Sequence, residues 1–164
     1  MESNNSTLIA YRDKYKVDLY NNELIAAISI LSVLKHLKQG TTALLVLVLP
    51  IISEKKTLNF LAKQNTKIRS IEELILKNPE TIVNFNNRYL SNLGTSINAI
   101  FLLKEMQLIQ INGNVISYID DNEIDFSSKQ LGARLEKIIN CSEKLSYILE
   151  DKIENIYLQL RVNL

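Results

Sequence analysis

The chain has 164 residues, of which 46% are hydrophobic and 23% are charged, and this composition is typical of a globular domain. Its 19 Lys and Arg residues nearly balance its 18 Asp and Glu residues, which argues against a dedicated nucleic-acid coat because such a coat needs a basic surface. The sole cysteine, Cys141, excludes a disulfide framework and a cysteine metal site. At this length we expect a single domain over residues 1–164.

The chain has no secretory or membrane-spanning pattern. Its first residues lack a basic segment followed by an apolar one. The longest apolar run, residues 43–52, is too short to cross a bilayer. We therefore expect a cytoplasmic protein with no membrane partner.

The N-terminal part predicts an arm followed by a helical core. Residues 1–20 form the arm, in which Tyr11, Tyr15 and Leu19 share one helical face. This pattern favours packing on the protein's own core or on a partner, and the basic residues among the aromatics leave nucleic-acid contact as the alternative. Residues 21–77 form the helical core, and its first helix is apolar on most of its girth and ends at Gly40.

The apolar run at residues 43–52 follows Thr41 and Thr42, either of which can cap a helix. Periodicity does not separate a buried helix from a buried strand here, and we favour a helix that stops or kinks at Pro50. Burial of about seven such side chains contributes on the order of 10–20 kcal/mol before entropy. Leu47, Leu49 and Pro50 are therefore candidate core or partner-facing residues.

Two shorter helices complete the helical core. Ser53 or Glu54 begins the first, and residues 64–69 form a polar loop. Ser70 and Glu73 match a capping box, so the second helix starts there and ends near Lys77.

Residues 78–119 predict a winged-helix element, which consists of a helix, a tight turn, a second helix and a β-hairpin. Asn78 is the candidate N-cap residue, and Pro79 occupies the first helical position. Gly94 can adopt the positive φ that ends a helix, and Thr95 or Ser96 then caps the second helix.

The hairpin of this element is predicted by Asn-Gly at residues 112–113, which favours a type I′ turn between two apolar runs. In this register Ile109 faces Ile116, and Ile111 faces Asn114. One face then holds four apolar residues that can pack on the preceding helix: Ile109, Ile111, Ile116 and Tyr118. We expect substitutions on this face to unfold the hairpin.

Residues 127–164 predict the C-terminal helices. Ser127 or Ser128 caps the first helix, and the Asn-x-x-Glu pattern at residues 140–143 indicates a break before a last helix. Residues 120–125 are acidic but lack the Gly and the distal Glu of a calcium loop, so we expect a solvated turn.

The chain lacks the motifs of common catalytic sites: a Gly-rich phosphate loop, HExxH, CxxC and G-x-S-x-G. His36 is the sole histidine, and near a helix end it is expected to contact carbonyls rather than to transfer protons. No carboxylate pair stands out in an apolar context. We expect a protein that is not an enzyme and that needs no cofactor or metal.

The predicted winged element is electrically neutral, because Arg88 and Lys104 balance Glu80 and Glu105 within residues 79–119. A DNA-binding module usually neutralises roughly 6–10 phosphates, so contact with protein fits better than DNA reading. The candidate residues for contact with DNA or a partner are Arg88, Asn98 and Lys104. We expect changes at Arg88 or Lys104 to alter that contact and to leave the fold intact.

Three segments resemble the middle component of ABC-ATPase three-component systems. They are the apolar helix after Asn22, residues 42–52 with their Val-Leu-Pro step, and residues 129–135 with Leu131 and Gly132. Together the resemblance covers most of the chain. Leu131 and Gly132 are further candidate core or partner-facing residues, since the close approach of another helix or chain, or packing within the monomer, would explain a glycine near a helix start.

The resemblance is to the small subunit of Lamassu-type bacterial defence systems in particular. It implies a non-enzymatic bridge between an SMC-like ABC ATPase and an effector, commonly a nuclease, that acts against phage or plasmid DNA. DNA contact within the complex is a further expectation. A winged-helix DNA-binding transcriptional regulator is the first alternative, and a helical interaction module without an ATPase is the second.

Overall fold

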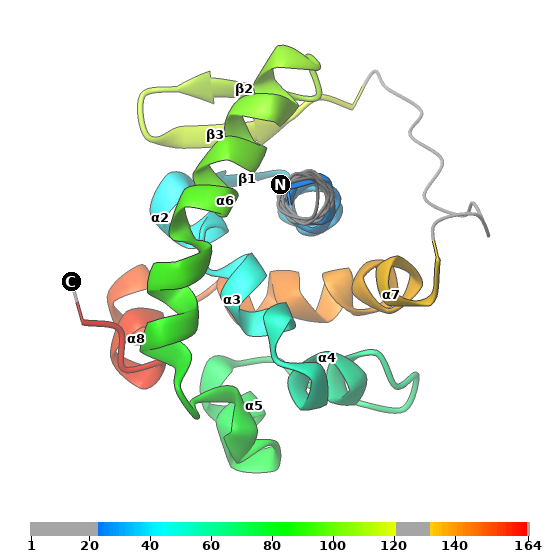
Figure 1. Cartoon of the computed structure of the whole chain (residues 1–164), viewed down its shortest axis with the longest axis vertical. Coiled ribbons are helices and arrows are strands. Elements are labelled where there is room, and N and C mark those ends of the chain that lie inside the picture. Colours follow the sequence, from blue (N-terminus) through cyan, green and yellow to red (C-terminus); the bar gives the residue numbers. More distant parts are fainter. Residues whose placement is uncertain (1–22, 121–131, 164) are drawn as a thin grey trace, which may run out of the picture.

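The computed structural model describes residues 23–120 and 132–163, which are mainly helical with one small antiparallel sheet (Figure 1). The predicted mainly helical class with a β-hairpin is confirmed. Residues 23–37 form the central helix, which lies between the sheet and the C-terminal helices (Figure 1). The elements that follow are β1 (Gln39–Thr41), α2 (Thr42–Leu45), α3 (Val48–Ser53), α4 (Lys55–Leu61), α5 (Ile71–Lys77), the 3-10 helix η1 (Pro79–Thr81), α6 (Phe85–Glu105), β2 (Ile109–Asn112), β3 (Val115–Tyr118), α7 (Gly132–Leu149) and α8 (Ile153–Gln159).

The apolar run at residues 43–52 is helical, as expected, but its break lies elsewhere. The side chain of Thr41 accepts a hydrogen bond from the Leu44 amide at 3.3 Å and caps α2. The helix is interrupted at residues 46–47, and Pro50 is the third residue of α3. Proline is tolerated there because amides of the first helical turn have no intrahelical acceptor. The expected kink at Pro50 is therefore wrong, and the interruption precedes it.

Strand β1 was not expected from the sequence. It pairs antiparallel with β3, with Gly40 opposite Ile116, and gives the strand order β1-β3-β2. The central helix ends at Lys38, whose φ of 65° is left-handed, so the expectation that Gly40 ends the helix is wrong. A strand of three residues is too short to show an alternating pattern, which explains why the sequence does not reveal it.

The hairpin forms with a register that differs from the expected one. Asn112 pairs with Val115, so Gly113 and Asn114 are the central turn residues. Only Gly113 of these two has positive φ, at 62°, which is the pattern of a type II′ turn rather than type I′. Ile111 therefore pairs with Ile116.

The shift in register is two residues, and it leaves the apolar face unchanged because side chains alternate with a period of two. The residues of this face are buried or packed against the core, as expected: Ile109, Ile111, Ile116 and Tyr118. The sequence thus predicted the face of the hairpin correctly and its turn incorrectly.

Helix α6 is continuous over 21 residues and runs through Gly94. The expected helix, tight turn and second helix within residues 79–105 are therefore wrong. The residues before and after Gly94 that are buried share one face at helical spacing: Phe85, Tyr89, Ser96, Ala99, Ile100 and Leu103. Packing of this uninterrupted face outweighs the cost of about 1 kcal/mol for a glycine in a helix interior.

Ser96 lies in the interior of α6 rather than at a cap. Its side chain is fully buried, and its hydroxyl has no hydrogen-bond partner among the residues that the structure describes. We expect Ser96→Ala to raise the free energy of unfolding by about 1 kcal/mol, because the buried hydroxyl no longer has to be desolvated.

Urea unfolding followed by circular dichroism measures this effect. Ser142→Ala is the matched control, since Ser142 is equally buried but donates a hydrogen bond to the Ile139 carbonyl at 2.7 Å. Equal destabilisation of both variants would show that the Ser96 hydroxyl has a partner after all.

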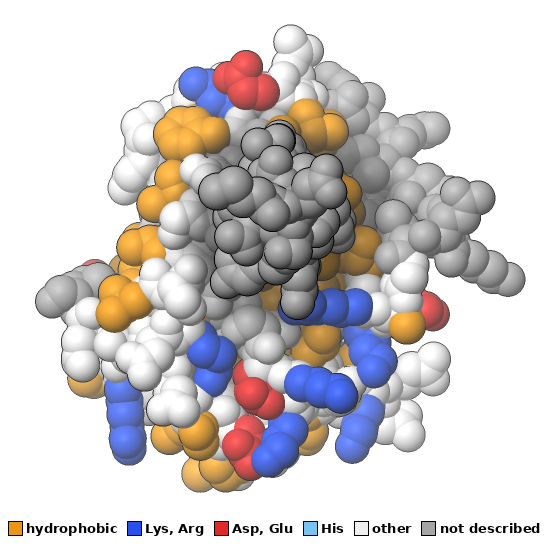
Figure 2. All heavy atoms as spheres, in the orientation of Figure 1, with side chains coloured by type: hydrophobic (Ala, Val, Ile, Leu, Met, Phe, Trp, Pro, Cys, Tyr) orange, Lys and Arg blue, Asp and Glu red, His pale blue; other side chains and the backbone are white. Residues whose placement is uncertain are grey.

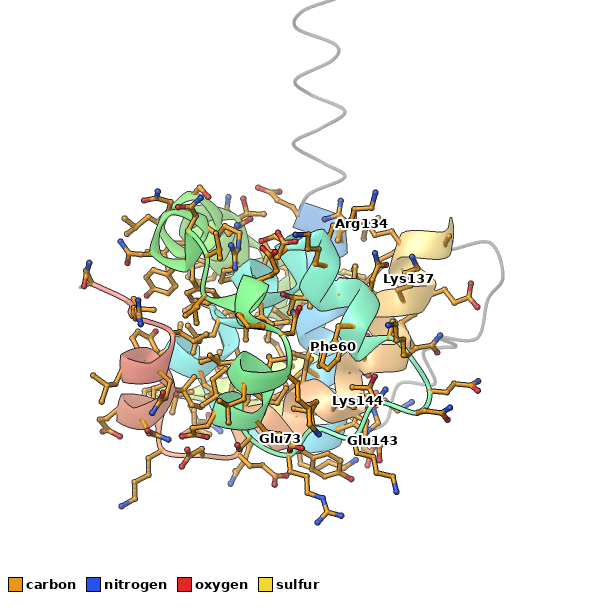
Figure 3. The ribbon with its side chains drawn as sticks, turned by 90° about the horizontal axis from the view of Figure 1, so that it is seen from below. Phe60, Glu73, Arg134, Lys137, Glu143 and Lys144 are labelled. Atoms are coloured by element: carbon orange, nitrogen blue, oxygen red, sulfur yellow. The ribbon has the colours of Figure 1, made fainter. Side chains whose placement is uncertain are left out.

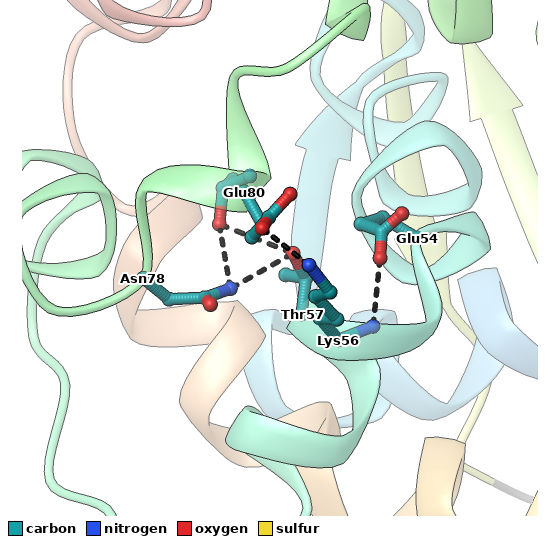
Figure 4. Close-up of polar contacts among 6 residues, drawn as sticks. Glu54, Lys56, Thr57, Asn78 and Glu80 are labelled. Atoms are coloured by element: carbon teal, nitrogen blue, oxygen red, sulfur yellow. Dashed lines mark hydrogen bonds and ion pairs between the residues drawn. The ribbon is translucent and has the colours of Figure 1, made fainter.

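Asn78 does not cap a helix with its side chain, contrary to the expectation. Its amide instead donates to the hydroxyls of Thr57 on α4 and Thr81 on η1, at 3.0 and 3.2 Å (Figure 4). An ion pair between Lys56 and Glu80 lies beside these contacts. This cluster holds η1, and with it the start of α6, against α4.

Helix α7 runs without the break expected at residues 140–143. Asn140, the cap residue of the expected pattern, lies in the interior of this helix. The break comes at residues 150–152, before α8. The N-terminal arm, Ser127, Ser128 and the acidic residues 121–125 lie outside the described residues.

Candidate functional site

Arg88 joins three segments of the backbone. Its Nε donates to the Pro50 carbonyl at 3.1 Å, its Nη2 to the Thr81 carbonyl at 2.6 Å, and its Nη1 to the Val83 carbonyl. The guanidinium also lies 5.3 Å from the centre of the Phe85 ring. Burial lowers the pKa of Arg88. These contacts join the start of α6 to α3 and η1, so from the structure we expect a change at Arg88 to affect the fold, unlike the expectation from the sequence.

Asn98 and Lys104 are exposed residues of α6. The Asn98 side chain donates to Glu23 Oε1 on the central helix at 2.8 Å. Arg88 and Lys104 are separated by about 24 Å along the helix axis, given the rise per residue of an α-helix. The structure therefore does not bring Arg88, Asn98 and Lys104 together into one cluster, and their contact with DNA or a partner stays a prediction.

Leu47, Leu49 and Pro50 lie in the core, where Leu47 is fully buried. Leu131 lies outside the described residues. Gly132 begins α7 with a φ of 81°, and no described atom lies within 4 Å of the position that a Cβ would take. Its backbone conformation, rather than close packing, accounts for glycine at this position.

An apolar groove lies between α6 and α8, and we call it the α6–α8 groove. Its volume is about 480 Å³. Its lining residues come from α2 and its C-terminal end, from α6 and from α8: Thr42, Ala43, Val46, Tyr89, Leu93, Ile97, Ile153, Glu154 and Tyr157. The Glu154 carboxylate is the only charged group of this lining.

Two tyrosines hold the walls of the α6–α8 groove together. The Tyr157 hydroxyl donates to the Ala43 carbonyl at 2.8 Å and lies 3.3 Å from the Tyr89 hydroxyl. The two rings meet edge to face, with their centres 5.9 Å apart. Burial, followed by the contact with Tyr89, raises the pKa of Tyr157, so the Tyr157 hydroxyl stays neutral at physiological pH. The groove is therefore a preformed surface whose only charged lining residue is Glu154.

A row of exposed apolar side chains, which we call the α6 stripe, runs beside this groove. Leu90, Ile97 and Phe101 are 55%, 37% and 56% exposed. They recur at positions i, i+7 and i+11 and so lie on one helical face. Figure 2 shows apolar side chains along α6. Exposed apolar patches that are contiguous mark sites of protein interaction.

The α6 stripe was not predicted from the sequence, because Gly94 indicated a helix end between Leu90 and Ile97. Leu90 then belonged to one helix, and Ile97 and Phe101 to another. The spacing of these three residues could have indicated the stripe, because they fall on one face of a helix with 3.6 residues per turn if the helix continues through Gly94.

The sole cysteine and the sole histidine lie apart from the α6–α8 groove. Burial raises the pKa of Cys141 to about 12, so its thiol is a poor nucleophile at neutral pH. His36 lies on the surface of the central helix, and desolvation lowers its pKa. Among residues 23–120 and 132–163, no three His, Cys, Asp or Glu side chains are placed to hold a metal ion.

None of the described helices is both long and apolar enough to cross a membrane. No curated protein matches the chain, and no solved structure matches it. A family model does match, that of the ABC-three component (ABC-3C) system Middle Component 3, over residues 13–164. The match covers most of the chain, as the resemblance of the three segments indicated, and middle components act with partners in a multi-component system. The chain therefore belongs to the Middle Component 3 family of ABC-three component systems.

Proposed function

We propose that this chain is a non-catalytic adaptor that links an SMC-like ABC ATPase to an effector such as a nuclease. The assembly would be a Lamassu-type complex that acts in the cytoplasm against phage or plasmid DNA. Membership of the Middle Component 3 family supports a role between other components. The exposed α6 stripe is the observation that carries the proposal, because a subunit that works only in a complex needs an apolar surface for its partner.

The α6 stripe and the α6–α8 groove together suit a protein partner rather than DNA. The groove is concave, its lining is mostly apolar, and its one charged residue is acidic. An apolar side chain of the partner that enters the groove, with the stripe beside it, would form the dry centre of an interface. Phosphates would gain no counter-charge from such a surface.

Co-purification with the ATPase encoded beside this chain tests the proposal. We expect the wild-type chain to purify with the ATPase, and Leu90→Gln combined with Phe101→Gln to weaken this association at least about tenfold, since a buried aromatic anchor commonly contributes 2 kcal/mol or more. Leu76→Gln on α5 is the matched control, because Leu76 is 81% exposed and lies outside the stripe and the groove.

The adaptor role would be contradicted if the chain purifies alone and does not bind the ATPase encoded beside it. Equal loss of association in the stripe variant and in Leu76→Gln would reject the α6 stripe as the docking surface. We also expect the isolated chain to hydrolyse neither ATP nor DNA, which assays of both activities check.

A winged-helix DNA-binding regulator is the second candidate, and the order of elements favours it. The central helix, β1, α2 and α3 come first, and α6 and the β2–β3 hairpin come after an insertion of α4, α5 and η1. The strand order β1-β3-β2 is one that winged-helix domains share. In this arrangement α6 would be the recognition helix. Sequence-selective binding by the isolated chain, with loss of binding in Lys104→Gln, would favour this candidate over the adaptor.

A further inference from the structure

A second concave surface lies between α3, α4 and the start of α7. Its volume is about 410 Å³. Its floor contains the buried residues Ile52 and Leu58, and three of its eight lining residues are cations: Lys55, Arg134 and Lys137. None of the lining residues is acidic. We call this surface the α4–α7 cleft.

The cations of the α4–α7 cleft have no carboxylate partner within the described residues. The ion pairs of the described residues are made by three other lysines, none of which lines the cleft: Lys38, Lys56 and Lys77. Glu54 precedes Lys55 in the sequence, and Glu136 precedes Lys137, but neither glutamate lines the cleft. Glu54 uses its carboxylate to cap α4, where it accepts a hydrogen bond from the Lys56 amide at 2.8 Å. A net charge of +1 for the whole chain thus conceals a local excess of positive charge.

The geometry of α7 directs two of these cations to the same side. Arg134 and Lys137 are three residues apart, so they lie on one face on successive turns. Lys137 Nζ donates to Asn59 Oδ1 at 2.7 Å, which holds the ammonium group against α4. Figure 3 shows Arg134 and Lys137 beside α4, and Figure 2 shows Lys and Arg side chains gathered over α4 and the start of α7.

The exposure of these side chains indicates the class of ligand. All three cations are exposed. A site for a single small anion would hold it with buried donors that replace its water, whereas a polyanion can bind through exposed, long-armed cations by release of its condensed counterions. Arginine in addition presents a planar fork that matches a phosphate.

We propose that the α4–α7 cleft binds the phosphate backbone of duplex DNA without regard to sequence. This site is separate from α6 and does not require the adaptor role, so each can fail without the other. With about three phosphate contacts, the affinity should be that of non-specific binding and should fall steeply with salt.

Fluorescence anisotropy of a labelled DNA duplex, titrated with the full chain at several salt concentrations, tests this proposal. We expect Lys55→Gln, Arg134→Gln and Lys137→Gln combined to weaken binding at least about tenfold, and the slope of log affinity against log salt to fall by about 1 for each cation removed. Lys137→Arg keeps the charge and should retain binding. Lys152→Gln, an exposed lysine at the start of α8, is the matched control.

Two results would overturn the assignment. The first is wild-type DNA affinity in the triple variant, above all if Lys104→Gln on α6 abolishes binding instead. The second is binding of a labelled polyglutamate of equal charge as tightly as DNA, because the cleft would then be a site for an acidic protein. Thermal unfolding of each variant shows whether its fold is intact, and co-purification of the triple variant with the ATPase separates this site from the docking surface.

Discussion

Arg88→Ala is expected to lower the free energy of unfolding by about 2–4 kcal/mol. The substitution leaves the carbonyls of Pro50, Thr81 and Val83 without the charged donor that now joins them. Hydrogen bonds to a charged group contribute about 1.5–3 kcal/mol each, and partial solvent access to this site reduces their sum. For a chain of this size the melting temperature should fall by roughly 2–4 °C per kcal/mol, which a thermal melt followed by circular dichroism measures.

Two variants make this result specific. Arg88→Lys keeps the charge but cannot reach three carbonyls with one ammonium group, so it should recover only part of the lost stability. Lys104→Ala removes an exposed cation of the same helix and should leave the melting temperature unchanged within error. Equal melting temperatures for Arg88→Ala and Lys104→Ala would show that Arg88 does not stabilise the fold and is free to contact a partner.

Ile116→Ala is expected to destabilise the protein by about 2–5 kcal/mol, the range for an isoleucine truncated in a packed core. Ile116 is fully buried in β3, the middle strand of the sheet, and pairs with Gly40 on one side and Ile111 on the other. Urea unfolding measures the loss.

Ser117→Ala, at the next position of β3, is the control for Ile116→Ala. Successive strand residues point to opposite faces, so Ser117 lies on the face away from Ile116. Its substitution should change stability by less than about 0.5 kcal/mol, as is usual for surface positions. Similar losses in both variants would mean that Ile116 and Ser117 do not lie on opposite faces of the sheet.

The sequence was most informative where a local interaction decides the structure. Glu54 caps α4 and is one of the two residues predicted to begin that helix. Ser70 caps α5 at the predicted position, where it accepts a hydrogen bond from the Glu73 amide at 3.2 Å. These contacts span only two or three residues, so the sequence contains all that they require. The apolar face of the hairpin was predicted for the same reason, because it depends on alternation alone.

The sequence was least informative where packing overrides a local signal. Gly94 and the pattern at residues 140–143 each resemble a helix end, yet α6 and α7 continue through them. In both helices an apolar face of constant period runs across the apparent stop. Burial of that face in the core contributes more free energy than the unfavourable local residue costs. Strand β1 exists only because β3 lies beside it.

The candidate sites follow the same division. The sequence by itself determined the helical class, the caps at Thr41, Glu54 and Ser70, the apolar run that becomes core, and the resemblance to the middle components of ABC-three component systems. These depend on composition, spacing and short motifs. Only the tertiary structure decided that Arg88 is a structural residue, that Leu90, Ile97 and Phe101 form one stripe, and that Lys55 meets Arg134 and Lys137 in one cleft. Each of these depends on segments far apart in the chain, or on the continuity of a helix, and such contacts form only when the whole core is packed.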